Sequence, residues 1–220
     1  MKMTKDDFWA LIAQAKERCG QDLDASAEWL EAQLLGMGPQ EVRSFGNILH
    51  GYLTLANKFG LWTAANIMLD GCTDDGFIDF RSWLIAQGKD VYLAALRDPD
   101  TLAEVPLYGG GCFESLAYIG GEALEKLTGR DACDRFDRAA YQRLLDDLKQ
   151  DIVYGEGIDY PYRWSEAVAY LPALCSKYLT VEEIQRRVQQ RDDTWNPTSP
   201  EVRRARATAK KGKKLGGDAR

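Results

Sequence analysis

Hydrophobic residues recur along most of the chain at the spacing of one face of an α-helix. Apolar side chains from Phe8 to Ala15 fall at positions i, i+3, i+4 and i+7, and the stripe from Phe45 to Ala56 is the most regular. This spacing indicates amphipathic helices that bury one face. Residues 61–69 are apolar almost all round, so we expect them to form the most buried, central helix.

The helical signal weakens after residue 100 but does not give way to strands. Further helices are expected over residues 113–127, 141–148, 164–171 and 181–188. Pro172 should kink or break the third of these. We find no alternating apolar and polar run of useful length and no internal repeat. The sequence therefore predicts an all-α fold, a globular domain of about eight to ten helices.

Breaker residues and charge divide the chain into three parts. We expect a helical domain over residues 1–130, additional helices packed on it over 131–195, and a disordered basic tail over 196–220. Residues 195–200, Trp-Asn-Pro-Thr-Ser-Pro, are typical of a linker. The tail has no apolar stripe to bury, and this predicts disorder.

Composition points to a cytoplasmic protein without a membrane segment. With 45% hydrophobic residues, the 220-residue chain can bury one full core. It has no apolar run long enough for a transmembrane helix and no signal-peptide pattern at its N-terminus. The five cysteines are scattered and His50 is the single histidine, so we expect reduced thiols and neither a zinc site nor another cofactor.

Charge is unevenly distributed along the chain. Residues 201–220 hold eight basic and two acidic side chains, a net charge of +6, whereas residues 1–200 hold 20 basic and 32 acidic side chains, a net charge of −12. An acidic body repels nucleic acid, so we expect at most weak, nonspecific binding through the tail. The candidate polyanion-binding residues are Arg203, Arg204, Arg206, Lys210, Lys211, Lys213 and Lys214.

The densest concentration of polar chemistry lies between residues 71 and 88. The candidate site residues there are Asp74, Asp75, Asp79, Arg81 and Gln87. In a structural interpretation, Asp74 and Asp75 are first-turn acids at the positive end of a helix dipole, and Arg81 forms an ion pair with one of them or with Asp79.

The apolar residues of the same segment predict a buried helix face. Phe77, Phe80, Trp83 and Leu84 occur at i, i+3, i+6 and i+7. We therefore expect Trp83 to lie in the core.

A metal-binding interpretation of this segment is weaker. Asp75, Gly76 and Asp79 match the middle of an EF-hand loop, but the first and last loop positions would be Gly71 and Ser82. An EF-hand requires Asp at the first position and a bidentate Glu at the last. Metal binding would therefore need further carboxylates from other helices, for which Glu114 and Glu122 are candidates.

The segment also resembles the signature of an uncharacterised bacterial family known as a domain of unknown function. The signature reads Gly-Cys-Ser/Thr-Asp-Asp-Gly-Phe…Asp-Phe-Arg-x-Trp-Leu-Ile-x-Gln-Gly and is matched by residues 71–88. Phe8-Trp9 and the Leu-Trp-x-Ala-Ala of residues 61–65 match two further family patterns. The resemblance covers about residues 3–130 and implies no particular activity.

Two classes of function follow from these observations. The favoured hypothesis is a non-catalytic bacterial interaction module in the cytoplasm that binds another protein. The alternative is a carboxylate-based, metal-dependent enzyme that uses Asp74, Asp75 and Asp79. The enzyme hypothesis requires these carboxylates to face a common space within about 5 Å.

Two other segments carry weaker signals. Residues 109–111, Gly-Gly-Gly, precede a predicted helix but lack the Lys-Ser/Thr of a P-loop, so we expect a flexible loop. The tyrosine-rich residues 154–162 would form a contact surface if exposed, or a connection tied down by its tyrosines if buried.

Overall fold

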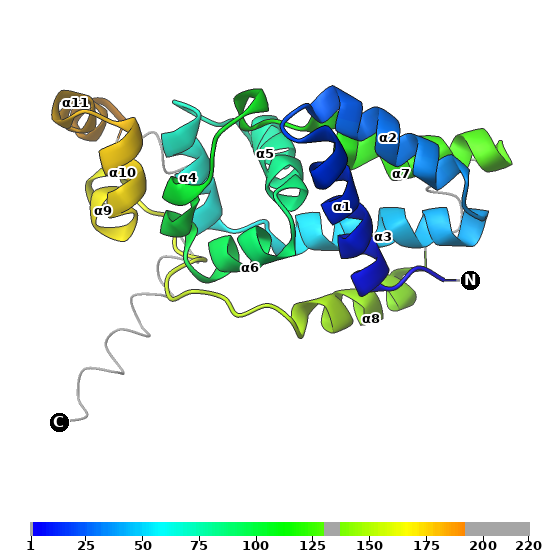
Figure 1. The fold of residues 1–220 in the computed structure, drawn as a ribbon. Coiled ribbons are helices and arrows are strands. Elements are labelled where there is room, and N and C mark those ends of the chain that lie inside the picture. The colour runs from blue at the N-terminus through cyan, green and yellow to red at the C-terminus, as the bar shows by residue number, and fades with distance from the viewer. Residues whose placement is uncertain (1, 130–136, 192–220) are drawn as a thin grey trace. The chain divides into compact units, whose positions relative to one another are not determined.

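The computed structural model describes residues 2–129 and 137–191 and contains only helices in these ranges (Figure 1). The all-α prediction is confirmed, with eleven α-helices and two short 3-10 helices among the described residues. In chain order these are α1 (Lys5–Cys19), α2 (Leu23–Leu35), α3 (Pro39–Leu55), α4 (Phe59–Met68), α5 (Asp74–Ala86), α6 (Lys89–Arg97), η1 (Pro99–Glu104), η2 (Gly109–Gly111), α7 (Glu114–Thr128), α8 (Arg138–Lys149), α9 (Trp164–Tyr170), α10 (Pro172–Tyr178) and α11 (Val181–Arg191).

The chain packs into two compact units whose segments alternate along the sequence. Among the described residues, the first unit contains 2–57, 72–93, 107–129 and 137–153, and the second contains 58–71, 94–106 and 154–191. The division expected from the sequence, into residues 1–130, 131–195 and 196–220, stays a prediction. The predicted tail, residues 196–220, lies outside the described residues.

In the first unit, α3 is the helix around which the others pack. It contacts α7 and α8, while α2 lies against α7 and α1 (Figure 1). Helices α3 and α7 approach each other closely at Gly46 and Gly120, because a Cβ atom on Gly120 would come within 2.9 Å of the Gly46 Cα. The ring of Phe8, from α1, packs against two aromatic rings of α3. Its centroid lies 5.2 Å from that of Phe45 and 5.6 Å from that of Tyr52.

The second unit is assembled around α4. Eight of the ten α4 residues are buried, the largest share of any helix in the described ranges, which confirms the expectation for residues 61–69. Pro172 ends α9 and opens α10, as its missing N–H predicts. Asp100 of η1 then caps α10, accepting the backbone N–H groups of Ala173 and Leu174 at 2.9 Å each.

The tyrosine-rich connection is tied down within the second unit. The Gly155 N–H donates to the Leu96 carbonyl at 3.0 Å, and the Gly60 N–H donates to the Ile158 carbonyl at 2.7 Å. Tyr162 stacks on Tyr170 with ring centroids 3.9 Å apart. The segment is therefore a fixed connection, the second of the two alternatives.

The helices of the described residues include none that combines the length and the apolar character needed to cross a bilayer.

Candidate functional site

The segment singled out by the sequence forms a sharp turn and then α5. Asp70 and Gly71 have φ angles of +56° and +123°, values at which glycine is favoured and an aspartate is uncommon. Thr73, and not an aspartate, is the N-cap of α5, since its hydroxyl accepts the Gly76 N–H at 3.1 Å. Asp74 follows in the first turn, where a carboxylate is favoured by the helix dipole.

Arg81 does not form the ion pair that the sequence predicted. Its Nη1 donates to the Leu53 carbonyl at 2.6 Å and its Nε donates to the Phe77 carbonyl at 3.1 Å. Asp79 is two residues from Arg81 in the helix, so it projects from another face, and Asp75 lies well over a turn away. The expected Asp–Arg ion pair was wrong for this geometric reason.

The position of Arg81 explains why this charged side chain is half-buried. Leu53 lies in the last turn of α3, where the carbonyl groups have no partner within the helix. A cation at this end also interacts favourably with the helix dipole. Burial lowers the pKa of Arg81, and the Phe77 ring lies 4.8 Å from the guanidinium carbon. Arg81 is therefore a structural cap for α3.

Gln87, another candidate, joins three segments of the first unit. Its side chain is buried, with 4% of the residue exposed, and its Nε2 donates to the Trp83 carbonyl at 3.0 Å and to the Tyr108 hydroxyl at 2.9 Å. Its backbone carbonyl accepts the Lys16 ammonium at 2.7 Å. No sequence pattern links Lys16 or Tyr108 to Gln87, because both lie far from residue 87 in the chain.

Of the predicted carboxylates, Asp75 lies within electrostatic range of Asp79, and so does Glu114. The Phe113 N–H donates to the Asp79 carbonyl at 3.1 Å, which sets the start of α7 beside α5. Burial raises the pKa of Asp79, and the nearby negative charges of Glu114 and then Asp75 raise it further. We call Asp75, Asp79 and Glu114 the acidic surface; Asp74 remains a candidate from the sequence.

The acidic surface has no cationic partner within the part of the chain that the structure describes. The six ion pairs found there involve other carboxylates. Glu122, the other carboxylate considered with Glu114, acts instead on Lys126, whose pKa it helps to raise. Like charges therefore crowd around Asp79 without compensation.

The described ranges contain no group of three or more His, Cys, Asp or Glu side chains placed to hold a metal ion. Cys72 and Cys112 lie within electrostatic range of Asp79. Burial raises the pKa of Cys72 to about 12 and also raises that of Cys112, with Asp79 adding to both shifts. Both thiols are therefore harder to ionise than a free cysteine.

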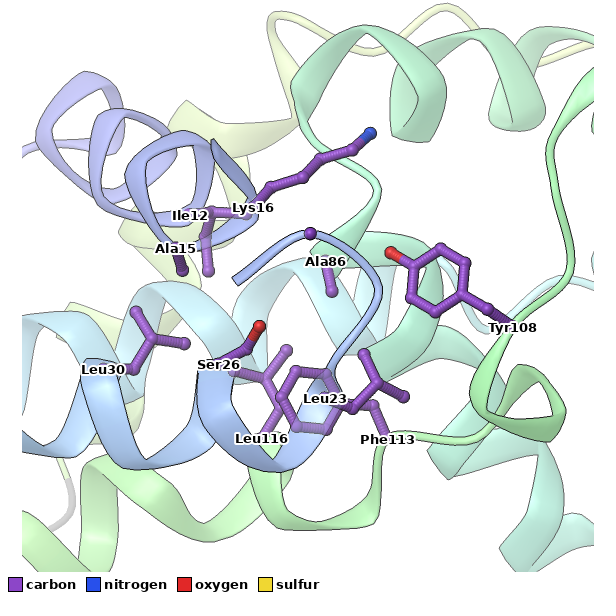
Figure 2. Close-up of a pocket in the computed structure, with 11 residues that line it drawn as sticks. Ile12, Ala15, Lys16, Leu23, Ser26, Leu30, Ala86, Tyr108, Phe113 and Leu116 are labelled. Carbon is purple, nitrogen blue, oxygen red and sulfur yellow. The ribbon is translucent and has the colours of Figure 1, made fainter. Parts of the chain in front are cut away.

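A small hollow opens where α1, α2, the end of α5 and the start of α7 meet (Figure 2). Its volume, including the part open to solvent, is about 280 Å³. Lys16, Ser26 and Tyr108 contribute the polar atoms of its lining, and Figure 2 shows the Tyr108 hydroxyl pointing toward Ala86. The hollow thus lies next to Gln87, which holds two of these polar side chains.

The remaining candidates have structural partners or lie outside the described residues. His50 Nδ1 is 2.5 Å from the Tyr141 hydroxyl, and burial, followed by the charge of Arg81, lowers its pKa. The three glycines 109–111 form η2 with left-handed φ angles, and a Cβ on Gly109 would collide with the Leu23 side chain. The basic tail residues, from Arg203 to Lys214, lie outside the described residues.

Comparison with known proteins agrees with the family resemblance seen in the sequence. Residues 3–126, more than half of the chain, match the family described as Protein of unknown function (DUF4240). The chain belongs to this family. No curated protein and no solved structure matches it.

Proposed function

We propose that this protein is a non-catalytic interaction module that binds a basic protein through the acidic surface. The observation that carries the proposal is the uncompensated crowding of carboxylates around Asp79. Besides burial, the negative charges of Glu114 and Asp75 disfavour the charged form of Asp79 and so raise its pKa. Lysine or arginine side chains of a partner would relieve this repulsion. Complementary charge also speeds association and selects partners.

The composition of α5 supports the same function. Ile78 is 37% exposed and precedes Asp79, so the helix offers an apolar contact beside its acids. Interfaces commonly combine an apolar centre with a charged rim.

The two other polar residues of the segment support a non-catalytic role. Arg81 bonds to backbone carbonyls and Gln87 is buried among Trp83, Tyr108 and Lys16. Both side chains are thereby committed to holding the first unit together. The scattered cysteines further suit the reducing cytoplasm, where we expect the partner to be found.

Affinity capture from the native cell, followed by mass spectrometry, tests the proposal. The bait is the full chain, its Asp75→Asn/Glu114→Gln variant, or the control Asp24→Asn/Glu28→Gln, which removes two exposed acids from α2. We expect basic proteins to be retained by the wild type and the control and lost with the first variant. Identical sets for all three baits would contradict the proposal, and calcium or magnesium binding that depends on Asp75 would favour the metal-dependent alternative.

A further inference from the structure

We propose that Trp164 and Asp70 form a socket for an arginine side chain, which Arg187 of α11 fills in the free protein and which an arginine of a partner protein can occupy instead. All three residues belong to the second unit. The socket is therefore separate from the acidic surface and independent of the function inferred there.

The contacts of Arg187 define what the socket recognises. Its Nη2 donates to Asp70 Oδ1, and its guanidinium carbon lies 4.7 Å from the centroid of the Trp164 ring. Trp164 is 2% exposed and Arg187 5%, so the stacked groups are shielded from water. A planar guanidinium stacks on an aromatic ring and bonds to a carboxylate at once, whereas the compact, strongly hydrated ammonium of lysine is less suited to both contacts. The socket therefore selects arginine.

One nitrogen of the buried guanidinium is left unused. Arg187 Nη1 has no hydrogen-bond partner among the described residues. A buried donor without a partner lowers the stability of the docked state. The Asp70 side chain is 84% exposed, so water and salt weaken its ion pair with Arg187. Arg187 is therefore held less firmly than a fully paired, fully buried arginine.

The rest of α11 adds little to this docking. Arg187 is the only buried residue of the helix among those whose side chains the structure describes. Val181 is 65% exposed, and Ile184 and Val188 are half-buried. The helix packs chiefly on α9, which carries Trp164 (Figure 1). A segment with few buried apolar contacts is one that opens locally while the rest of the fold stays closed.

Helix α11 can leave the socket without losing its own cap. The Thr180 N–H donates to the Glu183 carboxylate at 2.7 Å, and the Glu183 N–H donates to the Thr180 hydroxyl at 3.2 Å. This reciprocal capping box lies entirely at the start of the helix, so it is kept when α11 detaches. Release of α11 uncovers the Trp164 ring and frees the Asp70 carboxylate. The socket is then open to an arginine of another protein.

Titration of the full ¹⁵N-labelled chain with an arginine peptide, followed by NMR, tests the socket. The probe is a short alanine-based peptide that carries arginines, and its control carries lysines at the same positions. Shifts of the Asp70 amide and the Trp164 indole N–H report on the socket, whatever happens at the acidic surface.

Arg187→Ala empties the socket, and Arg186→Ala is the matched control that removes the same charge from an exposed neighbour on α11. Because the wild type must first release its own arginine, we expect Arg187→Ala to bind the arginine peptide about tenfold or more tightly than the wild type. Arg186→Ala should bind like the wild type. Adding Asp70→Asn to Arg187→Ala should remove the gain, since asparagine keeps the left-handed backbone of Asp70 but not its charge.

Hydrogen exchange of the wild-type chain provides a second measurement. Backbone amides of α11 should exchange faster than those of α4, and the arginine peptide, but not the lysine peptide, should accelerate them further. Three results would overturn the proposal: equal affinities of Arg187→Ala and Arg186→Ala, an equal gain for the lysine peptide, or α11 exchange that the arginine peptide leaves unchanged. The last comparison needs no variant, so it decides the matter even where Arg187→Ala folds poorly.

Discussion

At the scale of single residues, Arg81 shows how a charged side chain of the segment 71–88 stabilises the fold. Its guanidinium reaches the Leu53 carbonyl at the end of α3, 28 residues away, and makes no ion pair with Asp75. No local spacing rule predicts such a partner, because the contact depends on how α3 and α5 pack. Arg81 therefore caps the C-terminal end of α3 and is not part of an ion pair.

A double-mutant cycle on Asp75 and Arg81 distinguishes these roles. We expect Arg81→Met to lower the free energy of unfolding by about 1.5–3 kcal/mol, the usual value for a hydrogen bond to a charged group. The effects of Arg81→Met and Asp75→Asn should add within about 0.5 kcal/mol. Urea unfolding of the two single variants and the double variant measures this, and a coupling energy above about 1 kcal/mol would restore the ion pair.

Trp83 is fully buried, as its position beside Phe80 and Leu84 predicted. We expect Trp83→Ala to cost about 3–5 kcal/mol, because it removes a large side chain from the core. The Trp83 indole N–H has no hydrogen-bond partner among the described residues, so Trp83→Phe loses packing alone and should cost clearly less. Thermal and urea unfolding compare the two variants. A melting temperature unchanged by Trp83→Ala would show that the core assignment is wrong.

At the scale of helices, the crossing of α3 and α7 depends on Gly120. Alanine usually stabilises a helix interior by about 1 kcal/mol relative to glycine. Here the added Cβ would meet the Gly46 Cα at 2.9 Å, so we expect Gly120→Ala to destabilise the protein, by about 1–3 kcal/mol.

Gly46→Ala is the matched control on the other side of the crossing. Its Cβ would be 3.9 Å from Gly120, an ordinary contact, so this variant should be neutral or stabilising. Urea unfolding measures both variants, and equal effects of the same sign would show that the two helices do not meet through Gly120.

The acids where α5 meets α7 should reduce the stability of the free protein. The folded state raises the pKa of Asp79 above its ordinary value near 3.8, so the folded chain holds this proton more tightly than the unfolded chain. The stability that this tighter proton binding contributes is therefore present at low pH. It is lost as the pH rises through the pKa of Asp79 in the unfolded chain and then through its higher pKa in the folded chain.

Replacing Asp79 by asparagine tests this pH dependence. At pH 7 we expect Asp79→Asn to be more stable than the wild type, and the difference should shrink toward zero as the pH falls below about 3.8. Chemical unfolding across the pH range from about 3 to 7 measures the difference. A variant that is less stable than the wild type at pH 7 would show that the Asp79 charge is compensated.

At the scale of the whole molecule, the periodicity of the sequence was sufficient to predict an all-helical chain. The apolar run of residues 61–69 correctly predicted the most buried helix among the described residues, and Pro172 correctly predicted a helix break. The interleaving of the two units and the junction of Lys16, Gln87 and Tyr108 were not predictable, because both arise from contacts between distant segments. Of the candidate site, the carboxylates stay a prediction from their density in the sequence, and Arg81 was assigned the wrong partner.

Weak polyanion binding through the basic tail stays a prediction from charge. A gel-shift titration of the full chain against a truncation at Pro200 would test it, and equal binding by both would exclude the tail.

The central claim is that the acidic surface binds a basic partner, and an NMR titration with a lysine-rich peptide tests it most directly. The peptide is added to the full chain and to the Asp75→Asn/Glu114→Gln variant at low and at physiological salt. We expect wild-type shifts concentrated at residues 74–79 and 113–114, weakening with salt, and a much smaller response of the variant. Shifts spread over exposed acids elsewhere, such as Asp24 and Glu28, or an equal response of the variant, would contradict the account.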